Sequence, residues 1–125
     1  MAKFNILVID DEVNYPMAFK YLIESKGDYF VDIAANGSEG IQKLKKSRPD
    51  LLLLDIMMPG DDGIEVLKKI KGDVAIKDIP VVMLTAVETK SAKEEAAKLG
   101  VLGYLNKPID YDDLLVYIYK IKPKA

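Results

Sequence analysis

Acidic, basic and hydroxyl side chains stand directly behind four apolar runs of this sequence. Asp10 and Asp11 follow the first run and Asp55 follows four leucines, while Thr85 and Lys107 follow two later runs. Three carboxylates that meet in one place repel one another, so they need a hard divalent cation as their complement. A carboxylate nucleophile, a metal, an ammonium group and a hydroxyl donor form the set that phosphoryl transfer requires. The sequence therefore indicates phosphoryl-transfer chemistry, provided that these residues meet.

Asp55 differs from an ordinary surface acid because it directly follows the apolar run 51–54. A carboxylate at the rim of a buried strand needs a cation or a hydrogen-bond donor beside it. Lys107 and Thr85 would supply both. A purely structural group of acids does not explain a lysine and a threonine at matching positions, so the pattern favours a functional site over a solvated turn.

The chain has 125 residues and contains neither cysteine nor histidine. These absences exclude disulfides, zinc fingers, haem ligation, a cysteine nucleophile and a Ser-His-Asp triad within the chain. The donors that remain are oxygen atoms, which favour Mg²⁺ or Mn²⁺ over zinc. The length fits one domain whose hydrophobic core is stable without disulfides or a structural metal.

Charge and hydropathy narrow the possible partners. Twenty acidic residues against 18 basic ones give a net charge of -2, and Arg48 is the one arginine. Proteins that bind nucleic acids unaided usually present a clearly basic face. The N-terminal apolar run 6–9 is too short for a secretion signal, and no apolar run approaches the about 20 residues of a membrane span. We therefore expect a cytoplasmic protein that contacts neither nucleic acid nor a membrane directly.

Five short apolar runs recur along the chain, separated by longer segments with helical spacing. The runs are 6–9, 30–35, 51–54, 81–84 and 101–105. The first, third and fourth are apolar without interruption, which is typical of strands buried on both faces of a parallel sheet. The second and fifth are weaker, so we expect them at the edges of the sheet.

Residues that start or stop helices bracket the segments between these runs. The expected helices are 13–26, 39–46, 64–71, 92–99 and a last one after Asp110 with the apolar stripe Leu114, Leu115, Ile118 and Ile121. Glycines suited to the left-handed position after a helix are Gly27, Gly72 and Gly100. Side chains suited to the N-cap are Ser38, Asp62, Ser91 and Asp110.

A strict alternation of strand and helix predicts the α/β class, with a parallel sheet, right-handed crossovers and helices on both faces. Ligands of such sheets bind beyond the carboxyl ends of the strands, near the point where the strand order reverses. The polar residues named above all stand at those ends. A doubly wound sheet would therefore gather them in one site.

Four segments resemble the motifs of the receiver domain of two-component response regulators. They are Ile6-Leu-Val-Ile-Asp-Asp-Glu12, Leu51-Leu-Leu-Leu-Asp-Ile-Met-Met-Pro-Gly60 with Asp62-Gly63, Val81-Val-Met-Leu-Thr-Ala86, and Gly103-Tyr-Leu-Asn-Lys-Pro108. The spacing fits as well, because Thr85 follows Asp55 by 30 residues and Lys107 follows it by 52. The resemblance implies a flavodoxin-like, doubly wound (βα)5 fold with a five-stranded parallel sheet in the order 2-1-3-4-5. It also implies that residues 1–125 are a single receiver domain, with no output domain in this chain.

The resemblance implies a role for each acid. Asp55 would be the phosphoacceptor. Asp11 and Asp55 would bind Mg²⁺ directly, together with the backbone carbonyl of Met57, and Asp10 would hold the metal mainly through water. Mn²⁺ is the alternative metal.

The resemblance also implies a switch. Lys107, expected to precede a cis bond to Pro108, would pair with the acids and then with the phosphoryl oxygens. Thr85 would turn inward to donate to the phosphate, and Tyr104 would follow into the vacated space. The face formed by the fourth helix, the fifth strand and the fifth helix would then carry the signal.

The phosphoryl donor implied by the resemblance is a phosphohistidine on a sensor histidine kinase or a histidine phosphotransfer protein. Because this chain has no histidine, the donor must belong to another protein. The chain would not be an enzyme but a phosphoacceptor that assists its own phosphorylation and dephosphorylation. We expect a monomer or a weak, phosphorylation-dependent dimer that acts on an unidentified downstream partner.

Met57 and Val87 are apolar at positions that tune, in this family, how readily water reaches the acyl phosphate. We therefore expect a longer phosphoryl lifetime than in relatives with polar groups there. Replacing Met57→Asn together with Val87→Glu should shorten it.

Three other functions fit parts of the pattern. A magnesium-dependent phosphatase of the haloacid dehalogenase type also uses an aspartate nucleophile, but it needs a second aspartate where Met57 stands. A flavodoxin-like cofactor binder needs a phosphate-binding loop after the first strand, where Asp10 and Asp11 would repel a phosphate. A receiver that serves only as an unphosphorylated docking module is the third, although every acid of the pocket is present.

Overall fold

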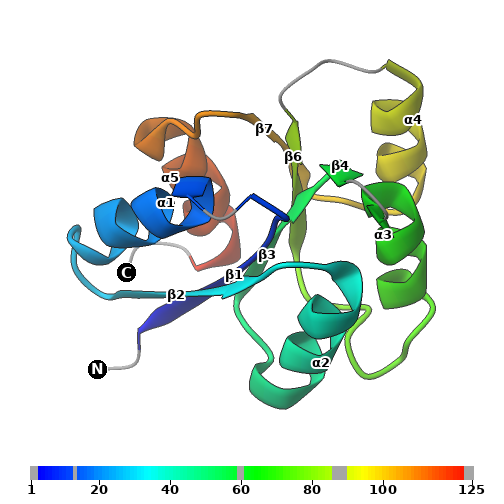
Figure 1. The fold of residues 1–125 in the computed structure, drawn as a ribbon, viewed down its shortest axis with the longest axis horizontal. Helices are drawn as coiled ribbons and strands as arrows, with labels where there is room; N and C mark the ends of the chain where they lie inside the picture. The colour runs from blue at the N-terminus through cyan, green and yellow to red at the C-terminus, as the bar shows by residue number, and fades with distance from the viewer. Residues whose placement is uncertain (1–2, 13, 59–60, 86–89, 123–125) are drawn as a thin grey trace.

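The computed structural model describes residues 3–12, 14–58, 61–85 and 90–122 (Figure 1). Its main sheet consists of β1 (Phe4–Ile9), β2 (Tyr29–Ala34), β3 (Leu51–Asp55), β6 (Val81–Thr85) and β7 (Gly103–Asn106). The strands lie in the order β2-β1-β3-β6-β7, and every neighbouring pair is parallel. This is the 2-1-3-4-5 order of a flavodoxin-like, doubly wound sheet, so the predicted fold class is confirmed.

The position of each strand follows from its pattern of apolar residues. The two weaker runs form the edge strands β2 and β7, as predicted. Every residue of the central strands β3 and β6 is buried, because helices cover both of their faces.

Helices cover the two faces of the sheet unequally. On one face lie α1 (Asn14–Glu24) and α5 (Tyr111–Ile121), and on the other lie α2 (Gly37–Ser47), α3 (Gly63–Lys71) and α4 (Lys90–Lys98) (Figure 1). Alternate residues of one strand enter different cores. In β1, Ile6 and Val8 belong to the core under α1 and α5, whereas Leu7 and Ile9 belong to the core under α2, α3 and α4.

Several helix ends match the sequence and others do not. Asp62 and Asp110 cap α3 and α5 as predicted, and each accepts a hydrogen bond from the amide two residues later, at 2.8 Å. The predicted cap Ser38 is wrong: α2 begins at Gly37, and the side chain of Asn36 accepts the Glu39 amide at 2.8 Å. The extended backbone of Asn36 lets its carboxamide reach that amide, which leaves Ser38 inside the first turn.

Two further predictions about helix ends are also corrected. Ser91 lies inside α4, which includes Lys90, so Ser91 is not the residue that precedes the helix. Gly27 and Gly100 have positive φ values of 134° and 84°, but Gly72 has a right-handed conformation at φ -86°. The chain after Gly72 continues into another right-handed turn, in which the carboxylate of Asp73 accepts the Ala75 amide at 2.9 Å, so no left-handed residue is needed.

A short antiparallel pair that the sequence did not suggest follows β3. It consists of β4 (Met57–Met58) and β5 (Asp61–Asp62), and it leads directly into α3. The Gly63 amide donates to the Ile56 carbonyl at 2.9 Å, which ties the start of α3 to the end of β3. Among the helices of the described residues, none combines the length and the apolar character needed to cross a membrane.

Candidate functional site

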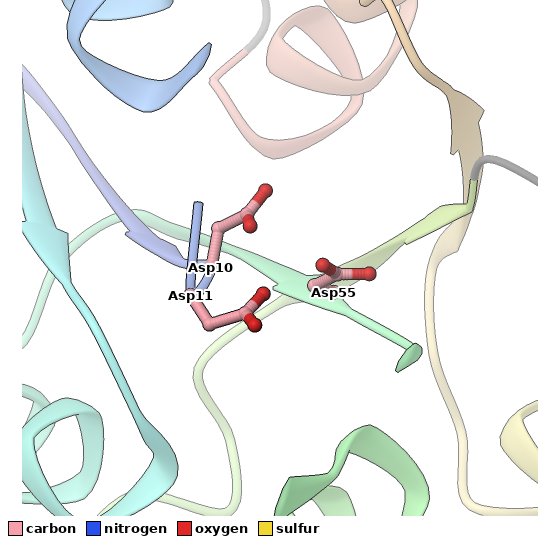
Figure 2. A group of neighbouring side chains, drawn as sticks. All are labelled: Asp10, Asp11 and Asp55. Atoms are coloured by element: carbon pink, nitrogen blue, oxygen red, sulfur yellow. The ribbon is translucent and has the colours of Figure 1, made fainter. Parts of the chain in front are cut away.

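Three carboxylates predicted from the sequence lie together at the carboxyl ends of β1 and β3. Asp10 and Asp11 follow β1, and Asp55 is the last residue of β3 (Figure 2). One carboxylate oxygen from each residue lies within 4.8 Å of the others. The parallel register of β1 and β3, in which Ile9 is paired with Leu54, brings these residues to the same edge of the sheet.

Hydrogen bonds continue the sheet just beyond the strands and fix the backbone that carries the acids. The Asp10 amide donates to Ala34 of β2 at 3.0 Å, and the Ile56 amide donates to Leu84 of β6 at 3.0 Å. Asp10 is 1% exposed and Asp55 is 4% exposed, whereas Asp11 is more accessible. Two of the three carboxylates therefore have little water around them and depend on neighbouring groups for their stability.

Lys107 is the cation that faces these acids. Its Nζ lies 2.6 Å from Oδ2 of Asp10, 2.9 Å from Oδ2 of Asp55 and 3.2 Å from Oε1 of Glu12, and its side chain is 9% exposed. Burial alone lowers the pKa of Lys107, but the hydrogen bonds to Asp10 and Asp55 and their charges outweigh it and raise the pKa above the ordinary value of lysine. Lys107 is therefore held as an ammonium ion. The bond between Lys107 and Pro108 is cis, as the resemblance implied.

Thr85 ends β6 and is 4% exposed. Its carbonyl accepts the Lys107 amide at 3.0 Å, so the two residues are joined through their backbones. Thr85 is the last residue of β6, and Lys107 directly follows Asn106, the residue of β7 that is paired with Thr85.

Tyr104 lies on β7 between α4 and α5. Its hydroxyl donates to the carbonyl of Lys93 on α4, and the Lys93 ammonium lies 5.5 Å from the centre of its ring. The hydroxyl of Tyr117 on α5 accepts from the Tyr104 amide at 3.3 Å and donates to the Tyr104 carbonyl at 3.2 Å. The ring of Tyr104 also lines an open pocket of ≈ 500 Å³ on α4, together with Lys90, Lys93, Glu94 and Ala97.

The side chains of Met57 and Val87, which we expect to tune the phosphoryl lifetime, lie outside the described residues. The backbone of Met57 belongs to β4, two residues after Asp55, but its side chain lies outside the described residues. Val87 lies outside them entirely. The backbone carbonyl of Met57, expected to bind metal, is close in sequence to Asp55, and no described contact bears on its role.

Four residues that contact the site or its supports were not predicted from the sequence. Glu12 stands in the first motif and pairs with Lys107. Tyr15 of α1 accepts the Ile109 amide at 2.9 Å, and burial raises its pKa despite the lowering effects of that hydrogen bond and of Lys107. Tyr117 of α5 forms hydrogen bonds with the backbone of Tyr104.

The fourth missed residue is Gly63. A Cβ atom on Gly63 would lie 2.1 Å from the carbonyl oxygen of Asp55 and 2.7 Å from Cα of Ile56. Only a residue without a side chain permits α3 to approach the end of β3 so closely. The glycine after Asp62 could have signalled a close approach, but the sequence does not say to which backbone.

The chemistry of the donor set fits a hard divalent cation. Asp10, Asp11, Asp55 and Lys107 together carry a formal charge of -2, which a divalent cation would neutralise. Carboxylate and carbonyl oxygens are the ligands that Mg²⁺ prefers. These three acids could therefore hold such an ion beside Lys107 and Thr85, which is an arrangement suited to binding a phosphoryl group.

Comparison with known proteins agrees with this geometry. Residues 6–119 match the model of the family described as the response regulator receiver domain. The solved structure of the chemotaxis protein CheY4 from Vibrio cholerae is similar, with a TM-score of 0.85 and 29% identity over 96% of this chain and 99% of that one. The N-terminal domain of a response regulator receiver protein from Methanoculleus marisnigri JR1 is 37% identical, with a TM-score of 0.76 over 97% of this chain and 98% of that one.

Several curated relatives are longer proteins. The transcriptional regulatory protein ZraR of Klebsiella oxytoca is 40% identical over 110 residues, which are 88% of this chain and 24% of ZraR. Response regulator Rre1 of Synechocystis is 36% identical over 110 residues, which are 88% of this chain and 48% of Rre1. The chain spans 24% to 26% of the ZraR proteins that it matches. The fold, the geometry of the site and the match over residues 6–119 all indicate the same family. The chain belongs to the response regulator receiver domain family, whose members act in phosphorelay signalling.

Proposed function

We propose that this chain accepts a phosphoryl group on Asp55 from a phosphohistidine of a partner protein and changes its surface in response. The observation that carries the proposal is the buried carboxylate of Asp55, which lies 2.9 Å from Lys107 Nζ and within 4.8 Å of oxygen atoms of Asp10 and Asp11. Family membership supports the same role.

Mg²⁺ is the proposed cofactor, with Mn²⁺ as an alternative. Asp11, Asp55 and the backbone carbonyl of Met57 would bind it directly, and Asp10 would hold it mainly through water. The oxygen-only donor set and its negative charge support this assignment. When bound, the ion screens the charge between the attacking carboxylate and the phosphoryl oxygens.

The chain's own residues prepare the transfer. A carboxylate oxygen of Asp55 forms a bond to phosphorus while the phosphorus–nitrogen bond of the donor breaks, and the leaving imidazole nitrogen keeps the electron pair. Lys107 then exchanges its contacts with Asp10 and Asp55 for contacts with the phosphoryl oxygens. Because the chain acts on its own modified residue, we propose that it is a phosphoacceptor rather than an enzyme.

The phosphoryl group would act as a switch through charge and hydrogen bonds. It adds about two negative charges and three acceptor oxygens at the sheet edge. Thr85 would donate to one of these oxygens, and the space left by its side chain would admit Tyr104. Tyr104 now bonds to the Lys93 carbonyl and lines the pocket on α4, so its movement would alter the surface made by α4, β7 and α5.

The partners follow from the same chemistry. A sensor histidine kinase or a histidine phosphotransfer protein would donate the phosphoryl group, and the surface of α4, β7 and α5 would bind an unidentified target. We propose that residues 1–125 act as one receiver domain in the cytoplasm, as a monomer or a weak phosphorylation-dependent dimer, without direct contact to nucleic acid. Effects on transcription, as the name of ZraR suggests for that protein, would need another segment or partner.

Intact-protein mass spectrometry after incubation with acetyl phosphate and Mg²⁺ tests the proposal. We expect the wild-type chain to gain one phosphoryl group, and Asp55→Asn or removal of Mg²⁺ to abolish the gain. Asp50→Asn is a matched control, because Asp50 is an exposed acid before β3. Continuous release of phosphate from added esters would instead indicate a phosphatase. If the wild-type chain gained no phosphoryl group at all, an unphosphorylated docking module would be the remaining interpretation.

A further inference from the structure

Tyr15 links the ammonium group of Lys107 to the chain segment that follows it. The centre of its ring lies 5.5 Å from Lys107 Nζ, and its hydroxyl accepts a hydrogen bond from the Ile109 amide at 2.9 Å. We propose that Tyr15 is a positioning residue that holds Lys107 in place for phosphoryl transfer to Asp55. This inference rests on the proposed function of Asp55.

The contacts of Lys107 with acids do not by themselves fix one position of its ammonium group, because they come from three different residues. Its Nζ is shared between Asp10, Asp55 and Glu12, and the lysine stem has four rotatable carbons. The ring of Tyr15 adds an attraction of the cation–π type, which is strongest where water is excluded. The 9% exposure of the Lys107 side chain meets that condition.

The backbone around Lys107 is held on both sides. The Lys107 amide donates to the Thr85 carbonyl at 3.0 Å, and two residues later the Ile109 amide donates to the hydroxyl of Tyr15. The segment 107–109 is therefore anchored to β6 at one end and to α1 at the other. Tyr15 contacts both the tip of the Lys107 side chain and the end of this segment.

An aromatic ring suits this position better than another acid would. A phosphoryl group on Asp55 carries about two negative charges, so each additional carboxylate nearby would repel it. A neutral ring attracts the ammonium ion without adding a full negative charge to the site. We therefore expect Lys107 to leave Asp10 and Asp55 for the phosphoryl oxygens while its ammonium group stays close to the Tyr15 ring.

Two substitutions separate the contacts of Tyr15. Tyr15→Phe keeps the ring and removes the acceptor of the Ile109 amide, whereas Tyr15→Leu removes both. Tyr21→Leu is a matched control, because Tyr21 lies on the same helix with 72% of its surface exposed.

The first experiment measures the contact without any phosphorylation. Urea unfolding of wild type, Tyr15→Leu, Lys107→Met and the double variant gives the coupling between the two side chains. We expect a coupling of about three- to thirtyfold in the unfolding equilibrium constant, the range of a cation–π contact from partly exposed to desolvated. Effects that simply add would overturn the proposal.

The second experiment measures the rate at which acetyl phosphate with saturating Mg²⁺ phosphorylates Asp55. We expect Tyr15→Leu to slow the reaction roughly tenfold, as a small displacement of a charge-stabilising group does, Tyr15→Phe to slow it less, and Tyr21→Leu to leave it unchanged. In the Lys107→Met background, Tyr15→Leu should cause no further decrease in the rate. If Tyr15→Leu acted through a general loss of structure, it would lower the rate in that background as well.

The outcomes separate the two proposals. A wild-type chain that gains no phosphoryl group refutes the function of Asp55 and, with it, the role of Tyr15. A wild-type chain phosphorylated on Asp55, combined with an unchanged rate in Tyr15→Leu or with an equal loss in the presence and absence of Lys107, refutes only the role of Tyr15.

Discussion

Removing the charge of Lys107 should expose the repulsion between the acids that it separates. Lys107→Met keeps most of the side-chain volume and removes the ammonium ion that lies 2.6 Å from Asp10 and 2.9 Å from Asp55. One carboxylate oxygen of Asp10 lies within 4.8 Å of one carboxylate oxygen of Asp55. At an effective dielectric constant of 20, two unit charges at that distance repel each other by about 3.5 kcal/mol.

This magnitude agrees with the typical cost of removing one partner of a buried ion pair, about 3 to 5 kcal/mol. We therefore expect Lys107→Met to lower the free energy of unfolding by about 3 kcal/mol in EDTA at neutral pH. With a urea dependence of about 2 kcal/mol per molar, the unfolding midpoint would fall by about 1.5 M.

Mg²⁺ should then stabilise the Lys107→Met variant more than it stabilises the wild type. In the variant, the ammonium ion of Lys107 no longer competes with the metal for Asp10 and Asp55, so the difference between the two unfolding midpoints should shrink as Mg²⁺ is added. Lys98→Met, on the exposed side of α4, controls for the general loss of a positive charge. Equal stability of Lys107→Met and wild type in EDTA, or an equal response to Mg²⁺, would refute the reasoning.

Three further predictions concern the supports of the site. Gly63→Ala should lower the free energy of unfolding by about 3 kcal/mol in urea, because the added Cβ would meet backbone atoms that cannot move aside. Gly72→Ala is the control: the nearest atom to its added Cβ lies at 3.3 Å, so the cost should be less than about 1 kcal/mol. Equal effects of the two substitutions would contradict the close approach of α3 to β3. Burial and a hydrogen bond to a neighbouring tyrosine raise the pKa of Tyr29 to about 12 from 10.0. The contribution of Tyr29 to the free energy of unfolding is therefore complete below pH 10 and is lost as the pH rises toward 12. Tyr29→Phe should make the alkaline loss of stability shallower, as measured by circular dichroism. Tyr117→Phe should speed hydrogen exchange of the Tyr104 amide roughly fivefold or more, because that amide loses its acceptor, and an unchanged rate would argue against this bond.

The sequence predicted the fold and the gathering of the acids because both depend on simple patterns. Uninterrupted apolar runs such as 51–54 require burial on both faces, and strict alternation with helices then requires a parallel sheet. Once the strands are parallel, Asp10 and Asp55 must share an edge, whatever the details of packing. The resemblance supplied the strand order and the roles.

The contacts that the sequence could not predict join residues far apart in the chain or depend on backbone geometry. Tyr15 and Ile109 are 94 positions apart, and nothing in the helical pattern of α1 distinguishes Tyr15 from an ordinary half-buried aromatic. The cap of α2 was misassigned because Asn36 and Ser38 are both good caps, and only the extended backbone of Asn36 decides between them.

Above all, we propose that Asp55 receives the phosphoryl group. Borohydride converts an aspartyl phosphate to homoserine, so peptide mass spectrometry after treatment with acetyl phosphate, Mg²⁺ and borohydride locates the modified residue. We predict homoserine at position 55 and nowhere else, in an amount that falls to background when EDTA replaces Mg²⁺. A phosphoryl group on Asp10, Asp11 or any other residue, or modification at position 55 that does not depend on Mg²⁺, would contradict the account.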